Sequence, residues 1–104
     1  MTYATKIVLH LLSTQRNGLD ALIEDFMRDG VRYVGVVGPE CVSVEDVVDW
    51  ICLGPCDGTR ETYDMLTASH DGEMLEDAVD FAQSITSDYE GHALGDRVQV
   101  VTLG

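Results

Sequence analysis

The alternation of short apolar runs with amphipathic segments constrains the fold of this chain more than any other feature. Residues 31–37 (VRYVGVV) have a strand's length and an apolar pattern typical of a central parallel strand buried on both faces. Ahead of them, apolar residues recur from Leu19 at spacings of three and four, as on one stripe of an α-helix. Gly30 follows the last turn, where a left-handed residue commonly ends a helix.

The same two patterns fill the rest of the chain. Strands are predicted at residues 5–12, 31–37, 61–68 and 97–103. Helices are predicted from Leu19, after an N-cap at Ser43, and over residues 73–85. Strands separated by single helices favour parallel pairing through right-handed crossovers. We therefore predict one α/β domain over residues 1–104. It is a small three-layer β-α-β-α-β-α-β domain with a mainly parallel four-stranded sheet, a flavodoxin/Rossmann-like half, and strand order 2-1-3-4 is expected by analogy with flavodoxin-like folds.

The excess of acidic residues excludes some classes of binding partner. Nineteen acidic residues stand against six basic ones, which gives a formal net charge of −13. Such a chain is repelled by nucleic acid and by anionic membrane surfaces, so neither is expected as a partner. The acidity has three readings that composition does not separate: a solvated surface, adaptation to high salt, or an acidic face that docks a basic protein.

The cysteines and the chain's beginning bear on location. Residues 7–12 form only a short apolar run, without the order of segments of a signal peptide, and no run approaches the roughly 18 residues of a membrane span. Three cysteines are an odd number and too few for a disulfide scaffold. A reduced, soluble, cytoplasmic protein is expected.

Topology selects where a ligand site would lie. In parallel sheets ligands bind outside the carboxyl ends of the strands, at a switch in strand order. The loop S-T-Q-R-N-G after the first strand carries Arg16, which suits an anion, and the ligand-binding candidates are Ser13, Arg16, Asn17 and Glu40. The preferred alternative is an ordinary loop in which Asn17 or Ser13 caps the helix. No nucleotide fingerprint is present, so no cofactor is expected.

A cysteine and a histidine lie at the same predicted edge. Cys41 precedes a helix N-terminus, where partial positive charge favours thiolate, and His70 follows the third strand. With Asp71 or Glu40 nearby, the pair would support nucleophilic chemistry, which makes Cys41, His70 and Asp71 the catalytic candidates. The alternative, favoured on general grounds, is that Cys41 is a small buried apolar residue.

Cys52 and Cys56 form a C-x₃-C pair, C-L-G-P-C, which is a weak metal-site candidate. Zinc prefers four ligands, and this pair would need Cys41 or a distant histidine to complete a site. Because Cys52 lies on the apolar stripe of its predicted helix, burial explains it better, and no metal is expected.

Two stretches resemble a family of small bacterial proteins known as a domain of unknown function. They are residues 38–49 (GPECVSVEDVVD) and residues 67–78 (TASHDGEMLEDA), the latter continuing through Phe81 and Ala82. The resemblance implies a cytoplasmic α/β domain and brings no assigned activity. Family members carry tryptophans around these motifs, whereas this chain has Val44 and Ser69 there and keeps only Trp50. The resemblance draws attention to Cys41, Asp46, His70 and Glu73.

The leading functional hypothesis is a non-catalytic protein-interaction or regulatory module that acts through self-association or a protein partner. It predicts an exposed apolar patch near Trp50 or on an edge strand. One form of it is a small acidic immunity or antitoxin-like protein that neutralises a basic toxin. The alternative is a small enzyme or ligand-binding protein that uses the Cys41/His70 edge.

Overall fold

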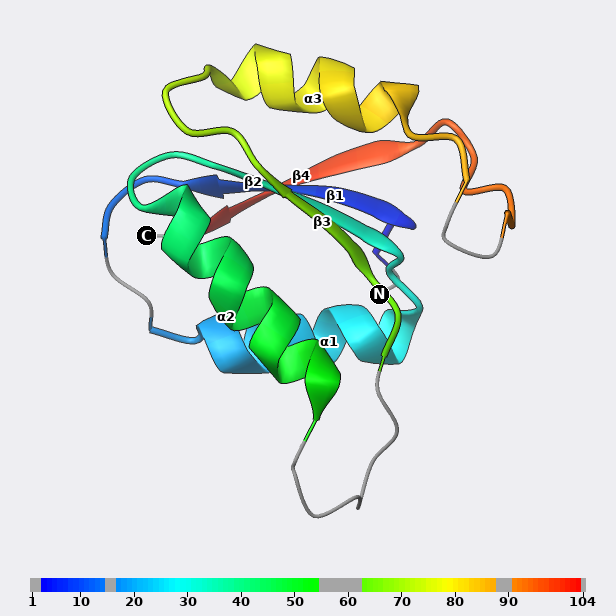
Figure 1. Ribbon diagram of the computed structural model, residues 1–104, viewed down its shortest axis with the longest axis horizontal. Coiled ribbons are helices and arrows are strands. Elements are labelled where there is room, and N and C mark those ends of the chain that lie inside the picture. The colour runs from blue at the N-terminus through cyan, green and yellow to red at the C-terminus, as the bar shows by residue number, and fades with distance from the viewer. Residues whose placement is uncertain (1–2, 15–16, 55–62, 88–90, 104) are drawn as a thin grey trace.

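A computed structural model describes residues 3–14, 17–54, 63–87 and 91–103 of the chain. The seven elements follow one another as predicted (Figure 1). Their bounds are β1 Lys6–Leu11, α1 Leu19–Asp29, β2 Tyr33–Val37, α2 Cys41–Leu53, β3 Leu66–Ser69, α3 Leu75–Ser84 and β4 Val98–Leu103. Each strand except the last is therefore joined to the next by a single helix.

The four strands form one parallel sheet in the order β3-β2-β1-β4. This confirms the predicted small α/β domain with a parallel sheet. The expected strand order 2-1-3-4 is wrong, because β3 pairs with β2 and lies at an edge, while β4 pairs with the other side of β1. Both orders satisfy the same crossover rule, so the local pattern that predicts the elements does not choose between them.

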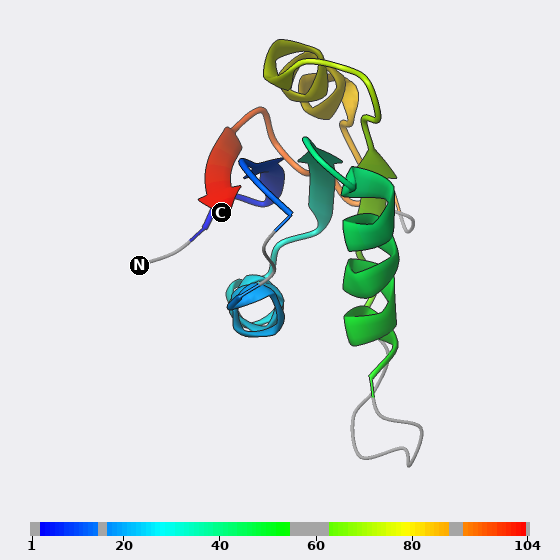
Figure 2. The same ribbon diagram turned by 90° about the vertical axis from the view of Figure 1, so that its left-hand side faces the viewer.

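Helices cover both faces of the sheet. α3 lies on one face, and α1 and α2 lie on the other (Figures 1 and 2). On β1, Ile7, Leu9 and Leu11 join the large cluster under α1 and α2, whereas Val8 joins the smaller cluster under α3. This division follows from the alternation of side chains along a strand. The run of buried apolar residues in β1 and β2 is explained by this burial on two faces.

The first helix is built as its apolar stripe predicts. Leu19, Ile23 and Phe26 are buried against the sheet, and Gly30 ends the helix with a positive φ of 82°. The N-cap, however, is Gly18, and among the described residues no side-chain hydrogen bond caps this helix, so the expected cap by Asn17 or Ser13 is wrong. A left-handed residue at the N-cap position is one that glycine adopts without strain.

The second helix begins earlier than predicted. Cys41 is its first residue and Glu40 its N-cap, with a positive φ of 58°, so the expected N-cap at Ser43 is wrong. Gly38 lies just before, at φ 116°, and any side chain there would overlap the Leu11 carbonyl oxygen. This close approach of two strand ends fixes where the chain turns from β2 into α2.

The third strand is shorter than predicted, at four residues. Residues 61 and 62 of the predicted strand lie outside the described residues, and residues 63–65 are not strand. A short strand suits its place at the edge, where only one neighbour pairs with it. No helix among the described residues is long and apolar enough to cross a membrane.

Candidate functional site

The switch in strand order lies between β1 and β4, since β2 and β3 follow on one side of β1 and β4 on the other. The loop after β1 is therefore at the switch. There Ser13 is half-buried and Asn17 exposed, while Arg16 lies outside the described residues. Glu40, at the start of α2, is exposed. His70 follows β3, at the far edge of the sheet from this switch.

Cys41 and His70 lie on opposite faces of the sheet. Cys41 is 0% exposed and belongs to the apolar cluster under α1 and α2. The His70 ring packs edge-on against Phe81 of α3, with 5.2 Å between ring centroids. The sheet thus separates the thiol from the imidazole, and the geometry does not assemble the nucleophile-base pair that the sequence suggested.

His70 is instead held by contacts with Glu73 and with β2. Its Nδ1 lies 2.9 Å from Oε2 of Glu73, and its main-chain N–H donates to the Val36 carbonyl at 2.8 Å. Its Nε2 is buried and has no hydrogen-bond partner among the described residues. Asp71, the next residue, is exposed. The His70–Glu73 contact ties the end of β3 to the beginning of α3.

A second buried polar atom lies on the same face. Tyr33 of β2 places its hydroxyl above Gly35, and that oxygen has no partner among the described residues. Burial, with a smaller contribution from the charge of Glu45, raises the pKa of Tyr33 to about 12. The buried Lys6 Nζ donates to the Ile85 carbonyl, at the end of α3, at 3.0 Å. The buried polar atoms of His70, Tyr33 and Lys6 therefore all lie between the sheet and α3.

The weak metal hypothesis gains no geometric support from the described residues. Cys52 is buried on the inner side of α2, as its place on the apolar stripe predicted, whereas Cys56 lies outside the described residues. Cys41 is a buried free thiol. Within the described part of the chain, no group of three or more His, Cys, Asp or Glu side chains is arranged to hold a metal ion.

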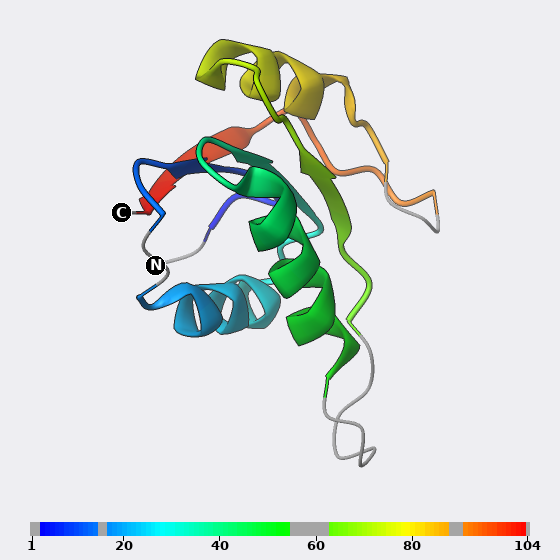
Figure 3. The same cartoon turned by 60° about the vertical axis from the view of Figure 1, so that its left-hand side comes forward.

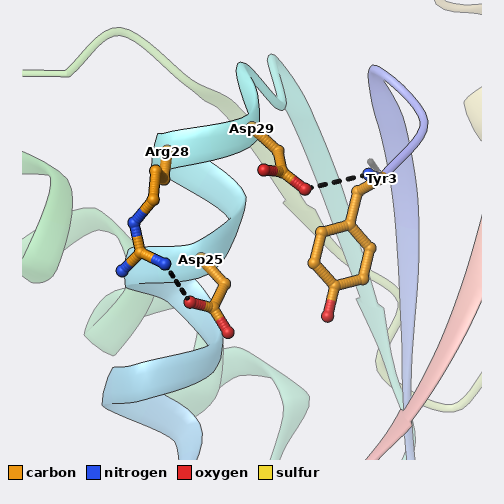
Figure 4. Close-up of polar contacts among 4 residues, drawn as sticks. All are labelled: Tyr3, Asp25, Arg28 and Asp29. Carbon is orange, nitrogen blue, oxygen red and sulfur yellow. Dashed lines mark hydrogen bonds and ion pairs between the residues drawn. The ribbon is translucent and has the colours of Figure 1, made fainter. Parts of the chain in front are cut away.

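A shallow hollow on α1 has its charges already paired (Figure 4). Arg28 and Asp25 form an exposed ion pair at 2.9 Å, and the Tyr3 main-chain N–H donates to Asp29 Oδ2 at 3.0 Å. The Tyr3 ring packs edge-on against Phe26 at 4.9 Å. These contacts tie the segment before β1 to α1, which is a structural role.

The outer side of α2 carries four of the eight large apolar side chains that are exposed among the described residues. Trp50 is 69% exposed, and Val47 and Leu53 lie three residues before and after it. Val42 lies about three helical turns from Leu53 and so falls on the same side. We call these four residues, Val42, Val47, Trp50 and Leu53, the α2 surface. In Figure 3, no other helix or strand covers the outer side of α2.

Acidic side chains border the α2 surface. Asp46 and Asp49 are exposed on α2, and the helix Cys41–Leu53 holds no basic residue. Asp49 accepts a hydrogen bond from Thr67 Oγ1 of β3 at 2.9 Å. A hollow of about 320 Å³ lies between α2 and β3, with Asp49, Leu53 and Asp64 among its lining residues. Asp46, four residues after Val42 and four before Trp50, lies within the α2 surface, and Asp49 lies at its edge. The α2 surface is thus an apolar stripe with acidic side chains in it and beside it.

The sequence pointed to Trp50 but not to the extent of the surface. Val47, an apolar residue next to the buried Val48, is itself 37% exposed. The signal lay in the composition of the helix: CVSVEDVVDWICL has more large apolar residues than one buried stripe holds. The excess must therefore face outward.

Fold and surface together define a small three-layer α/β domain with a parallel Rossmann-like sheet and an apolar, acid-bordered helix on its outside. The chain belongs to the family described as a domain of unknown function (DUF7684), which matches residues 4–103. The family resemblance predicted from the sequence is thereby confirmed. No curated protein matches the chain, and no solved structure matches it.

Proposed function

We propose that this protein is a non-catalytic interaction module that binds a basic protein through the α2 surface. The observation that carries the proposal is Trp50, the only tryptophan of the chain, at 69% exposure beside Val47 and Leu53. Tryptophan is strongly enriched among residues that dominate binding energy at interfaces. Burial of a side chain of this size against a partner would contribute about 1.5–3 kcal/mol that the exposed residue does not contribute to the fold.

The charge supports a basic partner. The molecule has a formal net charge of −13, and Asp46 and Asp49 lie beside the α2 surface. Complementary charge speeds association and excludes acidic partners, which include nucleic acid and anionic membranes. An immunity or antitoxin-like role, in which the partner is a basic toxin, is one form of this proposal. A reducing, cytoplasmic location is part of this proposal, and the buried free thiol of Cys41 supports it.

The test compares partner capture by matched variants. The immobilised wild-type protein, Trp50→Ser and Met74→Ser are each mixed with an extract of the source cells, and retained proteins are identified by mass spectrometry. Met74 is the control because it is 68% exposed and is the N-cap of α3, away from the α2 surface. We expect a basic protein on the wild type and on Met74→Ser, and its loss from Trp50→Ser.

The captured protein is then purified and titrated directly. Trp50 reports its own burial, so its emission should shift to the blue on binding. Trp50→Ala should weaken the Kd by about 30-fold, the effect of a residue worth about 2 kcal/mol. Raising the salt concentration should weaken binding as well. Equal capture by all three proteins, or a Kd that ignores both Trp50 and salt, would contradict the proposal.

A further inference from the structure

The sheet has two edges, and their outward main-chain groups can be assigned. On β4, the Leu103 carbonyl accepts from Leu12 N–H at 2.8 Å, so Leu103, Val101 and Gln99 face β1. Alternation leaves the main-chain groups of Val98, Val100 and Thr102 pointing away from the sheet. On β3, Leu66 and His70 bond to β2, which leaves Thr67 and Ser69 pointing outward.

The β3 edge is protected against pairing. It is only four residues long, and Asp64 and Asp71 flank it as exposed acids. α2 packs beside β3, and Asp49 of that helix accepts a hydrogen bond from the Thr67 hydroxyl. Short length and charge are the devices by which natural sheets avoid edge-to-edge association.

Among the described residues, the β4 edge is less protected, because only its beginning is flanked by charged side chains, those of Asp96 and Arg97. It is six residues long, and VQVVTL contains no charged residue, in a chain of which 24% is charged. Its register places Val100 beside Val8, on the α3 face. There α3 buries only Ala78 and Ala82 over β1 and β2, and Val100 stays 43% exposed. Figure 2 shows β4 at the edge of the sheet opposite β3 and α2.

We propose that β4 is a self-association edge, on which a second copy of this chain adds its own β4 in antiparallel orientation. A two-fold axis through Val100 pairs Val98 of each copy with Thr102 of the other. The three outward residues of each strand then face one another, which allows about six main-chain hydrogen bonds. Two four-stranded sheets become one continuous eight-stranded sheet.

Charge and side-chain chemistry favour a second copy at this edge over the basic partner of the α2 surface. An uncharged strand has no side-chain charge that would attract a cationic partner. Two uncharged strands, in contrast, pair without repulsion between like charges on facing side chains. Asp96 and Arg97, at the start of β4, lie at opposite ends of the paired strands in this register. The remaining repulsion between two acidic molecules acts at longer range, so salt should strengthen the association.

The first test measures mass in solution by sedimentation equilibrium, at protein concentrations from about 1 to about 200 µM and at low and high salt. We expect the wild type to approach twice the 11.4 kDa of one chain, and more readily at high salt. Val100→Lys places two like charges opposite each other at the axis and should leave a monomer. Val100→Pro removes an outward N–H and should do the same. Circular dichroism checks that both variants stay folded.

Two controls separate this edge from the α2 surface. Ser69→Lys, on the β3 edge, and Trp50→Ser should both leave the dimer intact. A wild type that stays at 11.4 kDa under every condition, or a dimer that survives Val100→Lys, would overturn the proposal. A dimer abolished by Trp50→Ser and kept by Val100→Lys would place self-association on α2 instead and overturn it equally.

The register has its own test. In a Cys56→Ser background, Val100→Cys brings two thiols face to face across the axis, at a main-chain separation of about 5.5 Å that a disulfide spans. Mild oxidation should give a covalent dimer, and Ser69→Cys in the same background should not. Equal cross-linking of the two variants would contradict the register.

Discussion

At the residue scale, Tyr33 and Tyr63 differ in what their hydroxyls contact. Tyr63 Oη donates to the Val31 carbonyl at 2.7 Å, whereas Tyr33 Oη is buried without a partner among the described residues. A buried hydroxyl without a partner loses its hydration and gains nothing in return. Tyr33→Phe should therefore leave the free energy of unfolding unchanged or raise it by up to about 1 kcal/mol, and Tyr63→Phe should lower it by about 1 kcal/mol. Urea denaturation at neutral pH measures both.

The same tyrosine sets an alkaline limit to stability. The pKa of Tyr33 is raised from 10.0 to about 12 in the folded protein. Between these values the unfolded chain has lost the phenolic proton and the folded protein still holds it, so stability falls as pH rises. The change in pKa from 10.0 to about 12 corresponds to a free energy on the order of 2–3 kcal/mol. Tyr33→Phe should remove most of this fall in urea denaturation between pH 10 and pH 12, and an unchanged pH profile would contradict the assignment.

At the element scale, the helices differ in how firmly they are held. α1 buries Leu19, Ile23 and Phe26, whereas α3 buries only Ala78 and Ala82, and the unpartnered polar atoms of Tyr33 and His70 lie on its side of the sheet. Since a large apolar side chain contributes about 1.5–3 kcal/mol on burial, α3 should open more easily than α1. Hydrogen exchange followed by mass spectrometry should show protection in α3 at least about tenfold lower than in α1. Equal protection of both helices would show that α3 is held by more than its two alanines.

Elements were predictable where a local pattern determines them. The stripe from Leu19 to Met27 and the glycine after it define α1, and Cys52 lies on the buried side of α2 as its spacing requires. The start of α2 was not predictable, because Glu40 adopts a left-handed conformation that glutamate rarely takes. Two residues earlier, Gly38 approaches Leu11 closely, a contact between two strand ends that a local pattern does not encode.

At the scale of the whole molecule, the face of the sheet on which each side chain packs decided which candidate site residues meet. Cys41 and His70 both follow strand ends, as predicted, but Cys41 packs below the sheet and His70 above it against Phe81. A side chain's face depends on its exact register and on the helix that covers it, and one residue of offset reverses the face. The acid-bordered α2 surface, by contrast, follows from composition, because the helix has more apolar residues than one buried face accommodates.

The net charge of −13 acts on the whole molecule and makes the last prediction. At low ionic strength the acidic groups repel one another across the compact state, and salt shortens the range of that repulsion from about 30 Å at 0.01 M to about 8 Å at 0.15 M. Sodium chloride should therefore raise the Tm, by about 4–8 °C for each kcal/mol of repulsion removed. Near the isoelectric point of about 4.2 the charge is almost neutralised, and the same salt series should leave the Tm nearly constant. A Tm that rises equally at both pH values would show that salt stabilises the fold by an effect that does not depend on the protein's charge, and would contradict this prediction. Because salt should weaken binding of a basic partner while it strengthens the fold and the β4 pairing, one salt series measured on all three separates the roles of the acidic surface.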